Sequence, residues 1–159
     1  MRKLHFYTLF CTLILCGSYV FQSSRDLTGI YVLDSKSYMK DGERFGKHGK
    51  LLVKEITDNR ISISLMLNNG APGYNSGSFI DTLSVDSNGL TKYISECDTS
   101  CVITFSFLKE AVLVRQVSER QYGACCFGLG VNVSGRFLKK SDEVPVIRDL
   151  TASDEITDY

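Results

Sequence analysis

The stretch ISISLML at residues 61–67 alternates apolar and polar side chains over most of its length. Successive side chains of a β-strand point to opposite faces, whereas an amphipathic helix repeats every 3.6 residues. The alternation therefore predicts a strand that turns one apolar face toward a core. That face carries Ile61, Ile63, Leu65 and Leu67.

The same period of two recurs at residues 103–107 and 131–137, and less regular strands are predicted at 29–33, 50–56, 79–85, 90–95 and 112–117. Turn residues at 58–59, 86–89 and 109–110 separate these stretches at hairpin distance. No segment is long enough for a crossover helix, which argues for antiparallel pairing. We therefore expect an all-β, antiparallel small barrel of about eight strands, with a β-sandwich as the alternative.

The beginning of the chain has the pattern of an export signal. Arg2 and Lys3 precede a mostly apolar run at residues 4–15, which is too short to span a bilayer as a helix. We expect residues 1–18 to be a signal peptide and the protein to be exported to the periplasm or cell envelope.

Two ways of processing this signal remain open. Cys16, followed by Gly17 and Ser18, is typical of the lipidated cysteine of an outer-membrane lipoprotein, which would remove residues 1–15 and leave a membrane anchor. Leu15 stands where a lipoprotein signal normally has a small residue. Ordinary cleavage after Ser18 is the alternative, and residues 19–26 form a tether in either case.

Residues 27–140 suit one domain, because roughly 100–150 residues bury a single core. Residues 25–140 contain 15 basic and 12 acidic side chains, whereas residues 141–159 contain six acidic side chains and Arg148. We expect this acidic tail to be flexible. The chain has no basic block large enough for a nucleic-acid backbone, so that partner is not expected.

Two long glycine-containing segments are predicted as loops, and long loops on a compact scaffold are common binding sites. The first spans Ser35 to Gly49, with a short helical turn as the alternative, and the second spans Asn68 to Ser78. The binding candidates on them are Lys47, His48, Tyr74, Asn75 and Ser76.

Four cysteines follow the signal, and an even number in an exported domain of this size predicts disulfides. Cys101 shares the apolar face of its strand, while the adjacent Cys125 and Cys126 would point in opposite directions on an extended chain. Their spacing does not match the paired C-x-x-C knuckles of structural zinc sites, so no metal is predicted.

The segment ACCFGLGVNVSGRFLKK at residues 124–140 resembles the closing box of a group of small, uncharacterised exported bacterial proteins. Their box is roughly C-G-F-G-x-G-V, a spacer, and G-x-Y or G-x-F. Cys126 stands where glycine is usual, and residues 29–31 and the CVITFSF strand fit the same group. The resemblance implies a shared fold and an envelope location without a known activity. The matching positions are Cys125, Phe127, Gly128, Gly130, Val131, Gly135 and Phe137.

Because Cys125 matches the cysteine of that box, the favoured pairing is Cys101 with Cys125 and Cys97 with Cys126. The swapped pairing stays open, since sequence alone does not fix connectivity.

The chain is also loosely similar to lipoprotein-type lysozyme inhibitors, whose inhibitory loop reads S-G, two residues, then Tyr. Ser76-Gly77 and Ser134-Gly135 supply the first half of that motif. Ile80 and Leu138 stand where the tyrosine is required, so the loop is incomplete.

His48 is the single histidine after the signal, and a lone loop histidine is typically exposed and inert, so a catalytic triad is not expected. Asp81, Glu96 and Asp98 are carboxylates without a distinguishing spacing, and no phosphate-binding loop is present. We therefore expect a non-enzymatic binding module without cofactor, whose partner is an envelope protein or a small ligand. A lysozyme inhibitor and a hydrolase with an unrecognised carboxylate site are the two alternatives.

Overall fold

The computed structural model describes residues 26–150. The predicted signal with Cys16, residues 19–25 of the tether and residues 151–159 of the tail lie outside the described residues. Within residues 26–150, no helix is long and apolar enough to cross a membrane. The described elements are β1 (Gly29–Leu33), β2 (Tyr38–Lys40), β3 (Glu43–Thr57), β4 (Arg60–Gly70), β5 (Ser76–Ser84), β6 (Leu90–Ile94), β7 (Val102–Phe107), β8 (Ala111–Val117), the 3-10 turn η1 (Ala124–Cys126) and β9 (Gly135–Ser141).

The strands form one antiparallel sheet in the order β5-β4-β3-β1-β9-β8-β7-β6, and β2 pairs with the outer part of β3. The last strand, β9, returns to pair with β1, which closes the sheet on that side. The strand order ends at β5 on one side and at β6 on the other, so the backbone pairing is interrupted between these two strands, at what we call the seam of the barrel. At this seam, Thr91 Oγ1 donates a hydrogen bond to the Ser84 carbonyl at 2.6 Å. The predicted all-β, eight-stranded antiparallel barrel is confirmed, and it is nearly closed.

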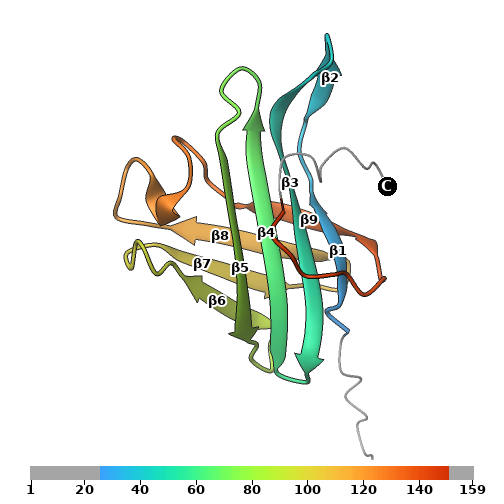
Figure 1. Ribbon diagram of the computed structural model, residues 1–159. Coiled ribbons are helices and arrows are strands. Elements are labelled where there is room, and N and C mark those ends of the chain that lie inside the picture. The colour runs from blue at the N-terminus through green and yellow to red at the C-terminus, as the bar shows by residue number, and fades with distance from the viewer. Residues whose placement is uncertain (1–25, 151–159) are drawn as a thin grey trace, which may run out of the picture.

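Strands β3, β4 and β5 run side by side, and β6, β7 and β8 cross behind them (Figure 1). Side chains fill the space between these layers, and the rings of Phe79 and Tyr93 stack with centroids 4.0 Å apart across the interrupted seam. The interior is therefore a packed hydrophobic core. Its largest fully buried members include Leu51, Ile61, Ile63, Leu65, Leu67, Ile103, Phe105 and Phe137.

The predicted loop from Ser35 to Gly49 is wrong, because most of this segment is the β2–β3 hairpin. Asp41 and Gly42 both have positive φ, 52° and 80°, the geometry of the two-residue turn that Asp-Gly favours between antiparallel strands. The stacked rings of Tyr38 and Phe45, 5.5 Å apart, hold the two strands together.

The second predicted loop is shorter than expected, because β4 continues to Gly70 and β5 begins at Ser76. The predicted strand at 131–137 is regular only from Gly135 onward. Val131 and Val133 are nevertheless buried in the core, which is why their alternation indicated a strand.

After β9, residues 142–150 cross the outer surface of the barrel in front of β4 and β3 (Figure 1). We call these residues the C-terminal segment. Ser64 Oγ on β4 donates a hydrogen bond of 2.7 Å to the Arg148 carbonyl, and Leu150 is buried in a second, outer cluster. The sequence did not indicate that the C-terminal segment packs on β4 through these two residues. The flexibility of the acidic tail stays a prediction. The other members of the outer cluster are Ile30, Leu52 and Met66, with Ile147 packed against them.

Candidate functional site at the disulfide-linked end of the barrel

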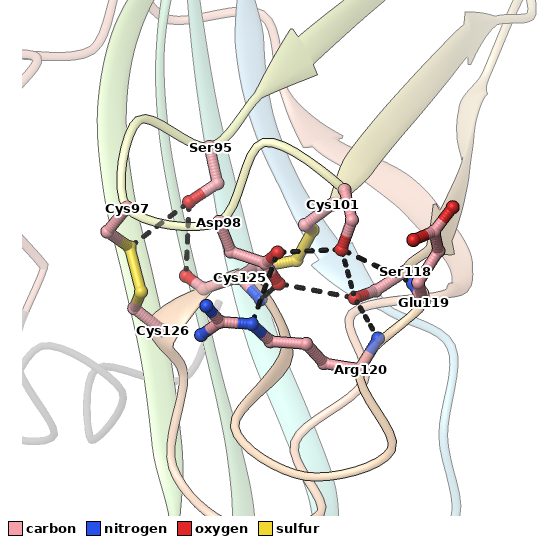
Figure 2. Close-up of polar contacts among 10 residues, drawn as sticks. Ser95, Cys97, Asp98, Cys101, Ser118, Glu119, Arg120, Cys125 and Cys126 are labelled. Carbon is pink, nitrogen blue, oxygen red and sulfur yellow. Dashed lines mark hydrogen bonds and ion pairs between the residues drawn. A yellow bond between two sulfur atoms is a disulfide. The ribbon is translucent and has the colours of Figure 1, made fainter.

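Two disulfides join the loop between β6 and β7 to the turn η1. Cys97 pairs with Cys126 and Cys101 with Cys125, with Cα separations of 6.3 and 5.2 Å (Figure 2). This is the connectivity favoured above from the strand face and the closing box. Cys101 and Cys125 are buried, whereas Cys97 and Cys126 are exposed. The two bridges therefore link the same two loops once inside the core and once at the surface.

The expectation that Cys125 and Cys126 lie on an extended chain is wrong. Both have a left-handed backbone, with φ of 59° and 61°. Such a conformation is costly for residues other than glycine and persists only where the surroundings hold it. Here two disulfides and a hydrogen bond from the Cys125 amide hold the turn, and the side chains still diverge.

Asp98 is the polar centre of this end of the barrel, and only 3% of it is exposed. Its carboxylate accepts hydrogen bonds from Ser100 Oγ at 2.7 Å, from the Cys125 amide at 3.0 Å and from Ser118 Oγ at 3.2 Å. Arg120 Nε reaches across the loop to the same carboxylate at 3.5 Å (Figure 2). One carboxylate thus connects the β6–β7 loop, the chain after β8 and the turn η1.

The hydrogen bond from Ser100, together with those from the Cys125 amide and Ser118 and the charge of Arg120, lowers the pKa of Asp98. Burial acts in the opposite direction and does not prevail. A carboxylic acid that donates a proton in catalysis needs a raised pKa instead. Asp98 is therefore suited to act as an ionised acceptor that connects the three segments.

The other two carboxylates of the hydrolase alternative occupy different settings. Asp81 on β5 accepts a hydrogen bond from the Thr82 amide at 2.6 Å, and Glu96 is exposed beyond the end of β6. In the described part of the chain, no group of three or more His, Cys, Asp or Glu side chains is arranged to hold a metal ion.

A hollow of about 420 Å³ opens beside this network. Its walls are the end of β8, the following loop and the segment before β9, and two arginines, Arg115 and Arg120, line it. Ligand sites commonly have volumes of about 300–1,000 Å³, so the hollow can hold a small group. Its remaining lining is Gln116, Val117, Ser118, Gln121, Ala124, Gly130, Val131 and Asn132.

Hydrogen bonds fix the walls of this hollow. Gln116 Oε1 accepts from the Val133 amide at 2.9 Å, and the Gln116 amide donates to Ser134 Oγ at 2.9 Å. These contacts connect the end of β8 directly to the segment before β9. Within residues 26–150, Arg115 has no carboxylate partner, whereas Arg120 shares its charge with Asp98. Arg115 therefore carries the uncompensated positive charge of the site.

The binding-loop candidates lie beside this region but outside the lining of the hollow. Ser76 accepts a hydrogen bond from the Gly128 amide at 2.8 Å through its carbonyl, and the Asn75 carbonyl accepts from the Asn69 amide. Tyr74 is exposed as expected, and a hydrogen bond to Glu43 raises its pKa. Their role in binding stays a prediction.

The two basic candidates are less accessible than expected. Lys47 Nζ donates to the Ser134 carbonyl at 2.7 Å, and burial lowers the pKa of Lys47. The expectation that His48 lies exposed in a loop is wrong: it is buried in β3, with Nδ1 2.8 Å from the Gly46 carbonyl. The glycines on either side suggested a loop, but Gly49 lies within the regular ladder opposite Leu67.

The half-motifs of the lysozyme-inhibitor similarity lie in packed surroundings. A Cβ at Gly77 would lie 2.4 Å from Cγ of Phe127, so the core requires glycine there. Gly135 is equally close to Leu33, since a Cβ would lie 2.5 Å from its Cδ1. Compared with known proteins, the chain matches no family model, no curated protein and no solved structure.

Sequence reasoning missed Arg115 and Arg120 as site residues. Arg115 occupies an outward position of a strand whose inward positions are Val112 and Val114. Alternation alone predicts that it is exposed, but the neighbouring wall comes from residues 130–132, which the sequence does not place beside it. Arg120, five residues before Cys125, could have been found by a search for cations close in sequence to the predicted disulfides.

Proposed function

We propose that this protein is an exported, non-enzymatic binding module whose hollow takes an anionic group, a carboxylate or a phosphate. The observation that carries the proposal is the pair Arg115 and Arg120 on the wall of a polar hollow. Guanidinium groups present several donors in a planar fork that matches carboxylate and phosphate oxygens.

Rigidity of the surrounding frame supports this role. Binding groups are most effective when packing and hydrogen bonds hold them in place before the ligand arrives. Two disulfides and the Asp98 network fix the loop that carries Arg120, and Gln116 fixes the opposite wall. The side-chain amides of Gln121 and Asn132 add further donors around the guanidinium groups.

An exported location is part of the proposal. Disulfides persist in oxidising compartments, and the pattern of residues 1–18 is that of an export signal. We place the protein in the periplasm or cell envelope, with lipidation of Cys16 and release after Ser18 both open.

The test is a titration of the purified, disulfide-intact protein with inorganic phosphate and, separately, with triglutamate, followed by NMR. We expect the side-chain signals of Arg115 and Asn132 to shift, and Arg115→Gln to weaken binding by about tenfold, as for loss of a charge-assisted hydrogen bond. Arg60→Gln, an exposed arginine at the start of β4, is the matched control and should bind like the wild type. If the Arg115→Gln protein binds phosphate and triglutamate as tightly as the wild type, the site is rejected.

A further inference from the structure

The outer surface of β6, β7 and β8 has an unusual composition for a solvent-exposed sheet. Ile103, Phe105 and Val114 point into the core, so the alternate residues of these strands point outward. We call this set of outward positions the bare face. Its members are Leu90, Lys92, Ile94, Val102, Thr104, Ser106, Leu113, Arg115 and Val117.

Strand register arranges the bare face in rows across the three strands. Ile94 lies opposite Val102, and Val102 opposite Val117, which makes one aliphatic row. The two ends of this row, Ile94 and Val117, are each 53% exposed. Contiguous exposed apolar groups of this kind are typical of interaction sites rather than of free surface.

The neighbouring row is cationic. Lys92 lies opposite Thr104, and Thr104 opposite Arg115, so two cations flank one hydroxyl. Arg136 on β9, opposite Leu113, adds a third cation beside this row, at the end of the next one. None of the outward positions of β6, β7 and β8 carries a carboxylate. The field over this face therefore favours an acidic partner.

A third row contains Leu90, Ser106 and Leu113, and both leucines are 43% exposed. The bare face thus alternates aliphatic, cationic and aliphatic rows. Rows are two residues apart along each strand, about 6.8 Å, which is also the repeat of same-side residues in an extended peptide.

We propose that the bare face is a docking surface for an extended acidic polypeptide segment in which aliphatic and acidic side chains alternate on one side. Such a segment, lying along the strands, would place aliphatic side chains on the two aliphatic rows and a carboxylate between Lys92 and Arg115. Because Arg115 and Val117 also line the hollow, this inference rests on the proposed function and names the class of its partner.

The side chains present argue for a polypeptide rather than a lipid surface. Proteins that lie in a membrane interface commonly place tryptophan or tyrosine at the headgroup level. All nine outward positions of the bare face are aliphatic, hydroxylic or cationic, without an aromatic ring. The regular row spacing also matches the repeat of a peptide, which a fluid bilayer does not have.

The test uses the purified full chain and a short synthetic peptide with the repeating order valine, serine, glutamate, serine, measured by calorimetry. In its extended form valine and glutamate alternate on one side, and we call it the alternating valine–glutamate peptide. Ile94→Ser and Lys92→Gln should each weaken binding by about tenfold, through lost apolar contact and lost charge pairing. Ile80→Ser on β5, also exposed but outside the bare face, is the matched control and should bind like the wild type. Circular dichroism of each variant verifies that it remains folded.

Three further measurements separate the outcomes. A peptide of the same composition with valines and glutamates in separate blocks should bind more weakly, since it cannot match the rows. Equal affinity of the Ile94→Ser and wild-type proteins overturns the inference, as does binding to anionic lipid vesicles without binding to the peptide. If phosphate and triglutamate fail to bind but the alternating peptide binds through Ile94 and Lys92, the hollow is rejected and the bare face stands.

Discussion

The outer surfaces of β3–β4 and of β7–β8 are built alike, with apolar side chains at outward positions, but residues 26–150 cover only the first. On the covered face, the C-terminal segment buries Leu52 and Met66 beneath Leu150. On the bare face, Leu113 and Val117 stay exposed. Outward apolar residues on a barrel strand therefore indicate a cover, which on one side is the chain itself and on the other, we propose, a partner.

Polar side chains at outward positions differ between the covered face and the bare face in the same way. Ser64, on the outward side of β4, is fully buried because the C-terminal segment lies over it and the Arg148 carbonyl accepts its hydrogen bond. Thr104, in the corresponding outward position of β7, lies between two cations and is partly exposed.

The largest expected effect uses a matched pair of leucines, one on each face. Leu52→Ala should lower the free energy of unfolding by about 2–5 kcal/mol, because it leaves a cavity beneath the C-terminal segment. Leu113→Ala should change it by no more than about 0.5 kcal/mol, as for an exposed site. Urea denaturation with both disulfides intact measures the free energy of unfolding of the two variants. Equal losses of unfolding free energy would contradict the difference between the faces.

A smaller effect is expected from the cover itself. Leu150→Ser should lower the unfolding free energy by about 2 kcal/mol, since burial of a leucine side chain is lost. Val146→Ser, on the same segment but 76% exposed, should leave stability unchanged. If thermal denaturation shows no difference between these two variants, the segment does not cover the barrel in solution.

The smallest effect concerns the hydrogen bond beneath the cover. Ser64→Ala should cost about 1–2 kcal/mol, because the Arg148 carbonyl loses its buried partner. Ser62→Ala, outward on the same strand and only partly buried, should fall within about 0.5 kcal/mol of the wild type. Chemical denaturation of the two variants decides this prediction, and a Ser62→Ala cost as large as that of Ser64→Ala would count against it.

The sequence predicted the barrel because alternation at 61–67 and 103–107 reports which side of a strand is buried. It did not predict the β2–β3 hairpin, where the glycines at 42, 46 and 49 suggested a loop although Asp41-Gly42 forms a tight turn. The local sequence pattern identifies strands well. A glycine, however, is compatible with both a loop and a hairpin turn, and which of them forms depends on whether the flanking segments pair as strands.

The candidate site was less predictable than the fold. Strand direction and the closing box favoured the pairing of Cys101 with Cys125, because both signals are local. The hollow depends on Arg115 and Asn132 meeting across a gap, and the cover depends on Leu150 reaching Leu52. Contacts between residues far apart in the chain leave no periodic trace in a single sequence.

Methyl NMR with a soluble paramagnetic agent tests the central claim most directly, since it reports how close solvent comes to each side chain. We predict strong broadening of the Leu113 and Val117 methyl signals and protection of Leu52. Adding the alternating valine–glutamate peptide should protect Leu113 and Val117 and leave Leu52 unchanged. Equal broadening of Leu52 and Leu113 without peptide, or no protection of Leu113 with it, would contradict the account.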